Sequence, residues 1–278
     1  EMMIDRCTWD DDYKAITQKI RKDLLAIGNV DEEQYTAVLM QGSGTFAVES
    51  VITSSVGEND KLLIIANGAY GERMGHIADH IKADYVIYNS SYNDHPDMNR
   101  VRKILEEDEK ITHIAIVHSE TTTGILNPIE KLADVAKEYK KTLIIDAMSS
   151  FGGVPINIGE LGIDFLISSA NKCIQGVPGF GFVIANKEKL EKCKGISRSL
   201  SLDLYDQYET MDKDGKWRFT SPTHVVAAFS KALDELKEEG GVEARYKRYK
   251  DNNMRLRRKL KDMGIEAYID EEKQSPII

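Results

Sequence analysis

The sequence predicts an α/β fold in which a mostly parallel sheet is sandwiched between helices. Two observations support this class. Short apolar runs alternate with helical patterns up to Ser197, and this alternation is typical of parallel sheets. Several runs are apolar on both faces, as strands covered by two helix layers must be. After Ser197 the pattern changes, and we predict a larger domain over 1–224 and a smaller α+β domain over 225–278.

The elements of the larger domain can be taken in order. Tyr13, Ile16, Ile20 and Leu24 are spaced as on one face of a helix, which predicts a first helix over 11–27. Strands are then expected at the short apolar runs, which are Ala37–Met40, Leu62–Ala66, Tyr85–Tyr88, Ile114–Val117, Leu143–Ile145, Phe165–Ser168 and Gly181–Ala185. Helical patterns fill most of the gaps, at 46–56, 70–82, 97–107 and 129–139.

The smaller domain begins with two long helical patterns, 223–238 and 241–262, and a short strand is predicted at Ile265–Ile269. The chain stops soon after this strand, so we expect a domain that lacks its second half. Basic residues are concentrated between Arg245 and Lys261 in the second helical pattern, and we expect them to form a solvated helix face.

Composition limits the possible functions. The 278 residues are 41% hydrophobic and 30% charged, with a net charge of −9, which argues against a partner with a phosphate backbone. No apolar run has the roughly 18 residues that a membrane span needs. Three cysteines without CxxC spacing are typical of a reducing, cytoplasmic setting and indicate no metal site.

Ligands of such sheets bind at the carboxyl ends of the strands, so the segments after each strand come first. Gly42-Ser43-Gly44-Thr45 follows the first strand and precedes a helix. Backbone amides at a glycine-rich helix start suit a phosphate. The pattern is neither a P-loop nor GxGxxG, and a plain turn with a helix cap explains it equally well.

Four more side chains follow strands. Tyr70 could stack on a flat ligand or pack in the core, and Thr121 begins three hydroxyl residues that could also be a polar turn. Asp146 is either a carboxylate that meets a buried cation or a helix cap, and Lys172 is either a Schiff-base amine or a surface lysine. Together they supply the partners that pyridoxal phosphate (PLP) needs.

At this point the chain resembles the class V, fold-type I PLP-dependent aminotransferases. The similar segments cover nearly the whole chain: DRCTWDDDY (5–13), QGSGTF (41–46), NGAYGERM (67–74), HSETTTGILNPI (118–129), IDAMSSFGG (145–153), ISSANKCIQGVPGFGFVIA (167–185), SRSLSLDLY (197–205) and KWRFTSPTHVV (216–226). The SANKCIQGVPG, SRSLSLDLY and WRFTSPTH runs resemble specifically the branch that acts on 2-aminoethylphosphonate.

The resemblance implies a role for each matching residue. Lys172 would form the Schiff base with the cofactor and move the proton, Asp146 would pair with the pyridinium nitrogen, and Tyr70 would stack on the ring. Thr121 would hydrogen-bond the ring hydroxyl. The cofactor phosphate would be held by Ser43, Gly44, Thr45 and Asn171.

The resemblance also implies a homodimer, because Thr220 matches a position that reaches the phosphate in the neighbouring subunit. The implied reaction transfers the amino group of 2-aminoethylphosphonate to pyruvate and leaves phosphonoacetaldehyde and alanine. The family's arginine for the acidic group of the substrate belongs to a C-terminal segment outside this sequence. Arg6 matches a segment near the active site, without an assigned role.

Three alternatives stay open. Another class V activity, such as alanine– or serine–glyoxylate transamination, would use nearly the same cofactor apparatus. Cysteine desulfurase fits less well, because Tyr70 rather than a histidine is at the stacking position. A non-catalytic α/β binding protein would show no covalent cofactor adduct. The lack of GxGxxG, GKS or GKT argues against a nucleotide binder, and the presence of Lys172 and Asp146 argues against a dead PLP-fold scaffold.

Overall fold

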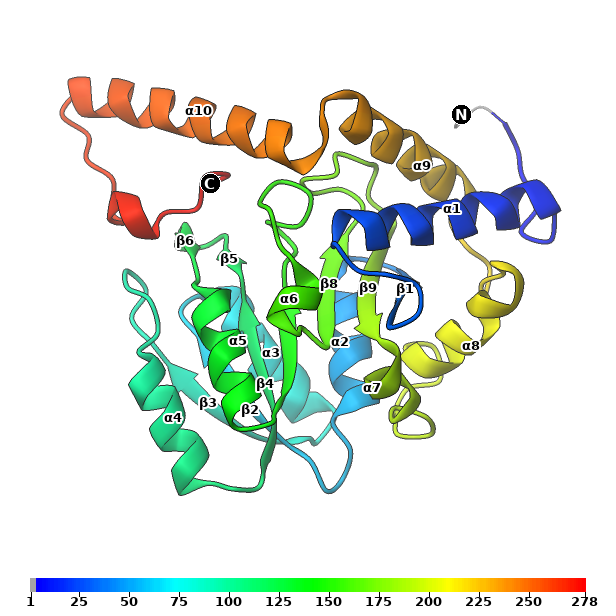
Figure 1. The fold of residues 1–278 in the computed structure, drawn as a ribbon, viewed down its shortest axis with the longest axis horizontal. Helices are drawn as coiled ribbons and strands as arrows, with labels where there is room; N and C mark the ends of the chain where they lie inside the picture. The colour runs from blue at the N-terminus through cyan, green and yellow to red at the C-terminus, as the bar shows by residue number, and fades with distance from the viewer. Residues whose placement is uncertain (1–3) are drawn as a thin grey trace.

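The structure is a computed structural model that describes residues 4–278, so the first three residues of the predicted larger domain lie outside the described part. Seven strands form one sheet in the order β1-β9-β8-β7-β4-β2-β3 (Figure 1). Their bounds are β1 Tyr35–Gln41, β2 Lys61–Ala66, β3 Asp84–Asn89, β4 Ile111–Val117, β7 Thr142–Asp146, β8 Phe165–Ser169 and β9 Phe180–Asn186.

Five neighbouring strands pair in parallel, and the sheet is mostly parallel as predicted. These are β3, β2, β4, β7 and β8. β9 is antiparallel to both of its neighbours, β8 and β1, so β1 runs in the same direction as the five. The carboxyl ends of β4, β7 and β8 therefore lie side by side at one edge, and this juxtaposition places the segments that begin at His118, Ala147 and Ala170 close together.

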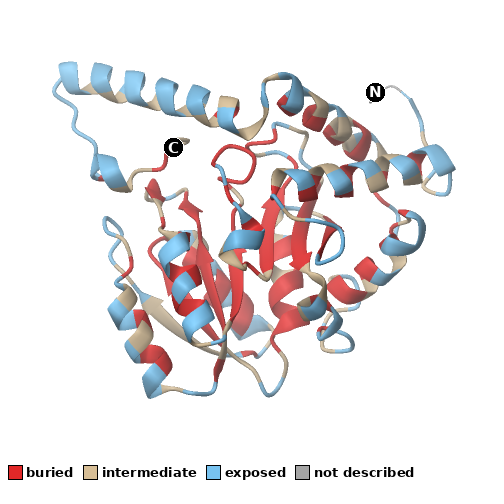
Figure 2. Cartoon of the chain, in the orientation of Figure 1, coloured by how far each residue is buried: buried red, intermediate tan, exposed pale blue. Residues whose placement is uncertain are grey.

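Helices cover both faces of the sheet, which confirms the predicted layers. One hydrophobic core includes residues of α1 (Asp11–Ile27), α4 (Met98–Glu107), α5 (Ile129–Glu138) and α9 (Thr223–Glu238). The other core includes residues of α2 (Gly44–Ser55), α3 (Ala69–His80) and α8 (Leu204–Asp214). Figure 2 shows the central strands buried between these layers.

The remaining elements are short, except for one long helix. They are the hairpin β5 (Ser119–Glu120) and β6 (Ile125–Leu126), the helices α6 (Ile158–Leu161) and α7 (Lys187–Glu191), the 3-10 turn η1 (Glu271–Lys273) and the long helix α10 (Gly241–Asp262). Among the described residues, no helix has both the length and the apolar character required to cross a bilayer.

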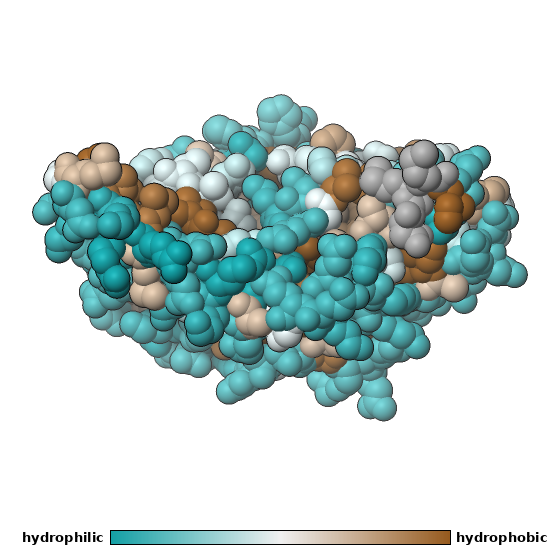
Figure 3. All heavy atoms as spheres, turned by 90° about the horizontal axis from the view of Figure 1, so that it is seen from above, coloured by the Kyte–Doolittle hydropathy of each residue, from teal (hydrophilic) through white to brown (hydrophobic). Residues whose placement is uncertain are grey.

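The predicted strand at Ile265–Ile269 is wrong, because the structure has no strand there. Ile265 and Tyr268 are 51% and 73% exposed, and Ile269 alone of these apolar residues is buried. A strand needs a neighbour for its backbone hydrogen bonds, and none lies beside this segment in the described chain. Figure 3 shows apolar side chains gathered at the end of the molecule where α10 finishes.

The prediction of a solvated basic face on α10 is correct for most of the helix and wrong for Arg245. Its side chain is only 3% exposed. α9, by contrast, packs on α1 and on the sheet: Phe229 meets Phe180 edge to face, with ring centres 5.0 Å apart. The domain boundary at 224/225 stays a prediction.

Candidate active site

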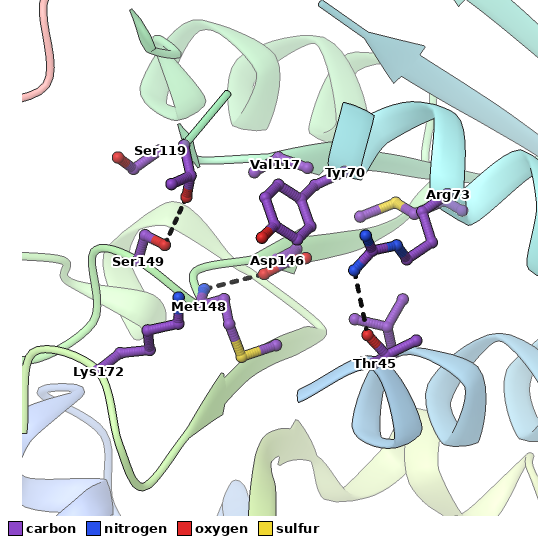
Figure 4. A pocket seen from close by; sticks show the side chains of 12 residues that line it. Thr45, Tyr70, Arg73, Val117, Ser119, Asp146, Met148, Ser149 and Lys172 are labelled. Atoms are coloured by element: carbon purple, nitrogen blue, oxygen red, sulfur yellow. Dashed lines mark hydrogen bonds between the residues drawn. The ribbon is translucent and has the colours of Figure 1, made fainter. Parts of the chain in front are cut away.

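A cavity of about 150 Å³ opens at the carboxyl edge of the sheet (Figure 4). Five predicted site residues line it, and each comes from a different segment of the chain: Thr45, Tyr70, Thr121, Asp146 and Lys172. The parallel strands bring these segments together, because β4, β7 and β8 are neighbours in the sheet. The remaining lining residues are Val48, Arg73, Met74, Val117, Ser119, Met148 and Ser149.

The other predicted residues are not among those that line the cavity. Ser43 and Gly44 precede Thr45 directly, and Asn171 precedes Lys172, so three of them belong to segments that border the cavity. Thr220 is exposed in the connection between α8 and α9. Its predicted partner is a neighbouring subunit, and a single chain does not test that prediction.

Asp146 is the last residue of β7 and is 4% exposed. Its carboxylate accepts one hydrogen bond, from the Met148 backbone amide at 2.9 Å. Burial is the main cause that raises the pKa of Asp146 to about 6. Within residues 4–278 no basic side chain forms an ion pair with it, and the charges of Lys172 and Arg73 in the same cavity lower its pKa less than burial raises it. A buried carboxylate of this kind is stabilised by a cation that enters the cavity.

Lys172 lies three residues after β8, in a turn closed by the Gln175 amide, which donates to the Lys172 carbonyl at 2.8 Å. The side chain is partly buried and reaches the cavity. In the described part of the chain its amine has no hydrogen-bond partner. Figure 4 shows the Lys172 amine and the Tyr70 ring approaching the cavity from different sides, with Asp146 between them.

A second buried carboxylate, Glu120, holds the wall that carries Tyr70. One of its oxygens accepts the Tyr70 and Gly71 amides at 3.2 and 3.3 Å, at the start of α3. The other accepts the Thr122 amide at 3.2 Å and the Thr122 hydroxyl at 2.7 Å. A side chain at Gly68 would collide with Glu120. This network fixes the backbone at the start of α3, from which the Tyr70 side chain extends.

The glycine-rich segment after β1 forms the opposite rim. Gly42 has φ +102°, which a side chain would strain. Ser43 is the N-cap of α2, and its side chain makes no capping hydrogen bond. A side chain at Gly44 would overlap Met148, so glycine lets the helix start approach the strand that ends in Asp146. The first amides of α2 are therefore free to bind an anion.

Two further contacts connect the rims. Arg73 donates to the Thr45 hydroxyl at 3.3 Å, and its guanidinium lies 4.6 Å from the centre of the Tyr70 ring. The Thr121 and Ser149 hydroxyls are 2.8 Å apart. The cavity thus has a carboxylate at its base, an aromatic ring on one wall, two cationic side chains and a helix start at its rim.

Comparison with known proteins identifies the family of this chain. The family model for class V aminotransferases matches residues 8–278. The chain belongs to the class V aminotransferase family. A 2-aminoethylphosphonate–pyruvate transaminase of Lysinibacillus sphaericus is 65% identical over 278 residues, which are 100% of this chain and 76% of that protein. One from Bacteroides fragilis is 57% identical over 279 residues, covering 100% and 77%.

Solved structures of aminotransferases share the fold. An alanine–glyoxylate aminotransferase from Nostoc sp. has a TM-score of 0.89 at 25% identity, covering 99% of this chain and 73% of that one. A PLP-bound phosphoserine aminotransferase from Trichomonas vaginalis has a TM-score of 0.76 at 17% identity, covering 98% and 72%. The second likeness, at this identity, concerns the fold alone.

Sequence reasoning gave no role to Arg73, which lines this aminotransferase cavity, or to Glu120, which lies behind its wall. Glu120 stands in the SETTTG segment, where its position beside three threonines was the only signal. Arg73 follows Tyr70 by three residues, a spacing that places both on one side of a helix. Neither signal reveals that the two side chains meet groups that are distant in the sequence.

Proposed function

We propose that this protein is a PLP-dependent enzyme that transfers the amino group of 2-aminoethylphosphonate to pyruvate. The observation that carries the cofactor is the buried Asp146 carboxylate, which has no basic partner in the described chain and faces one cavity with Lys172 and Tyr70. The proteins named as transaminases of this substrate pair, which are 65% and 57% identical over the full chain, support the choice of substrate.

The residues present fit the cofactor in three respects. Asp146 offers a carboxylate whose pKa burial has raised, so a protonated ring nitrogen would relieve the cost of its ionisation. Tyr70 offers an aromatic face on the cavity wall. The uncapped start of α2 after Ser43 offers backbone amides to a phosphate. Gly44, Thr45 and Asn171 complete our assignment of the phosphate-binding residues.

The chain's own residues then have distinct tasks. Bound PLP supplies an aldehyde that takes up the amine and a ring that withdraws electrons. Asp146 keeps the ring nitrogen protonated, Tyr70 holds the ring plane, and Thr121 orients the ring hydroxyl. Lys172 carries the amine that anchors the aldehyde and afterwards moves one proton between the substrate carbon and the cofactor.

The assembly completes the proposal. We assign Thr220 to the phosphate site of a second subunit in a homodimer, as the resemblance implies; its exposure and its place outside the lining of its own cavity are compatible with this role. We also assign the protein to the cytoplasm and keep the domain boundary at 224/225. Crosslinking or sedimentation of the protein tests the dimer, and Thr220→Ala should weaken PLP binding only in the dimeric form.

The decisive experiment is the visible absorption spectrum of the protein with PLP, before and after addition of 2-aminoethylphosphonate without pyruvate. We expect a cofactor band that this amine bleaches and that equal concentrations of alanine or serine do not. Faster bleaching by alanine or serine would keep the fold and move the protein to another class V activity. A protein without any cofactor band would contradict the proposal.

The first variant to test is Lys172→Ala. Removing the amine should lower transamination by at least about 1,000-fold, because both the anchor and the proton carrier are lost. Steady-state rates measure the effect, and Lys189→Ala provides a control, since Lys189 is a partly exposed lysine next to Asp164 and away from the cavity lining. A Lys172→Ala protein with the wild-type rate would refute the assignment.

A further inference from the structure

One charged side chain of α10 is buried although the helix itself is not. Arg245 is 2% exposed and is the only residue of this helix that counts as buried. An arginine removed from water requires a partner for its charge and acceptors for its five N–H groups. The contacts that meet this requirement lead directly to the segment that carries Lys172.

The guanidinium joins two parts of the chain. Its Nη1 donates to the backbone carbonyls of Cys173 and Ile174 at 2.8 and 3.2 Å. Its Nε and Nη2 each lie 2.7 Å from one carboxylate oxygen of Glu239, the C-cap residue of α9 in the turn that leads to α10. A second arginine, Arg248, also binds Glu239. Hydrogen bonds from Arg248, the larger cause, and from Arg245 lower the pKa of Glu239 to about 2.

A second contact reaches the same loop from the next turn of α10. The Gln175 side-chain amide donates to the Tyr249 hydroxyl at 2.7 Å. Gln175 has φ +65°, which is uncommon for a residue with a side chain and needs support from its surroundings. The loop closes on itself, because the Gly176 amide donates to the Ala170 carbonyl at 2.9 Å.

Arg248 provides an internal comparison. It also binds Glu239, with Nε 2.6 Å from the carboxylate, but its side chain is 43% exposed. In the described residues it makes no hydrogen bond to the loop 172–176. The two arginines therefore share a carboxylate and a helix, and only Arg245 contacts the loop.

We propose that Arg245, anchored by Glu239, is a positioning residue that fixes the loop 172–176 and thereby the direction of the Lys172 amine. The functional half of this inference rests on the proposed role of Lys172. Its structural half concerns the loop alone and can be tested without cofactor. In this arrangement the turn between α9 and α10 supports the loop that follows β8 and carries Lys172.

The first test compares Arg245→Met with Arg248→Met in the cofactor-free protein. Amide hydrogen exchange, read by mass spectrometry on peptides that span 172–176, reports opening of the loop. We expect the Gln175 and Gly176 amides to exchange about tenfold faster in Arg245→Met and within about twofold of wild type in Arg248→Met. Equal exchange in Arg245→Met and wild type, or equal acceleration in both variants, would overturn the proposal.

The second test measures the consequence for Lys172. Arg245→Met should retain PLP about tenfold less tightly and should lower kcat more than it changes KM for the amine, because the loss concerns orientation and not substrate binding. Arg245→Lys should retain PLP more tightly than Arg245→Met and should have a higher kcat. If amide exchange in 172–176 is faster in Arg245→Met but PLP retention and kcat are unchanged, Arg245 has a structural role only and the positioning claim is refuted.

Two outcomes remain separable. If the wild-type protein binds no PLP, the proposed function fails while the exchange result still stands. If Arg245→Met does not fold, Tyr249→Phe removes only the acceptor of the Gln175 side chain. This variant and Arg245→Lys should each accelerate exchange in 172–176, and unchanged exchange in both would contradict the inference.

Discussion

Two buried carboxylates lie at the cavity, Asp146 in its lining and Glu120 behind the wall that carries Tyr70, and they differ in how many hydrogen bonds they accept. Glu120, on the wall that carries Tyr70, is fully buried and accepts four hydrogen bonds from neighbouring backbone and side-chain groups. Asp146, at the base of the opposite wall, is 4% exposed and accepts one. Burial raises the pKa of Asp146 to about 6.

The difference separates a structural carboxylate from a functional one. Hydrogen bonds to an ionised group are each worth roughly 1.5–3 kcal/mol, so Glu120 is stabilised within the chain itself. Asp146 has free acceptor capacity that faces the cavity, and only a ligand can use it. Burial alone does not distinguish the two, whereas the number of hydrogen bonds that each receives does.

Asp146→Asn gives the largest expected effect and should move activity and stability in opposite directions. Asparagine keeps the acceptor for the Met148 amide but cannot pair with a protonated ring nitrogen, so transamination should fall by about 1,000-fold. The free energy of unfolding of the cofactor-free protein should rise by about 3 kcal/mol at pH 8, because a buried charge is removed. Denaturant titration and steady-state rates measure both; a destabilised variant would contradict the comparison.

Glu120→Gln should destabilise the protein, whereas Asp146→Asn should stabilise it. The amide group replaces one acceptor by a donor that faces backbone N–H groups, so the variant should lose about 3 kcal/mol of unfolding free energy. Activity should fall less than in Asp146→Asn, because the Asp146 carboxylate at the base of the cavity is unchanged. Urea titration gives the stability, and pre-incubation with PLP should recover part of it. A variant as stable as wild type would show that the four hydrogen bonds contribute little.

The pH dependence of the cofactor-free protein sharpens the same comparison. The folded pKa of Asp146 is about 6 and its ordinary value is 3.8, so the folded state holds this proton more tightly. The stability of wild type relative to Asp146→Asn should therefore fall as pH rises from 4 to 6, by about 2 kcal/mol. His113 and His118, whose pKa burial lowers, occur in both proteins and cancel in the difference. A constant difference over this range would refute the prediction.

Thr122→Val should have the smallest effect. It removes one hydroxyl that donates to Glu120 at 2.7 Å and leaves the three backbone donors in place. We expect a loss of about 1 kcal/mol in unfolding free energy and less than about a threefold change in rate. Thr123→Val is the neighbouring control, because in the described structure the Thr123 hydroxyl has no hydrogen-bond partner. Equal losses of unfolding free energy in both variants would show that the hydrogen bond from Thr122 to Glu120 contributes nothing specific to stability.

The sheet and its helix layers could be predicted because their signal is local. Runs such as Leu143–Ile145 are apolar without interruption, and the structure extends this one by a residue at each end. The segment at Ile265–Ile269 failed for a physical reason. Apolar residues make a strand possible, but a strand forms only beside a partner, and no strand pairs with this segment in the described chain.

The site could be predicted in part. Strand ends direct attention to Tyr70, Asp146 and Lys172, because the topology of a parallel sheet gathers its carboxyl ends. Glu120 and Arg245 were out of reach, since their roles depend on backbone groups that only the folded chain brings near. A charge on a helical pattern predicts exposure on average, and the carbonyls of Cys173 and Ile174 make Arg245 an exception.

The edge position of β1 has a consequence for synthesis on the ribosome. β1 pairs only with β9, so that Tyr35 meets Asn186 and Gln41 meets Phe180. The glycine-rich rim after β1 therefore cannot take its place while the chain up to β8 emerges, and the first strand waits for the last. Such distant pairing slows folding, and a nascent chain shorter than about 190 residues leaves an apolar strand unprotected, where a chaperone would bind.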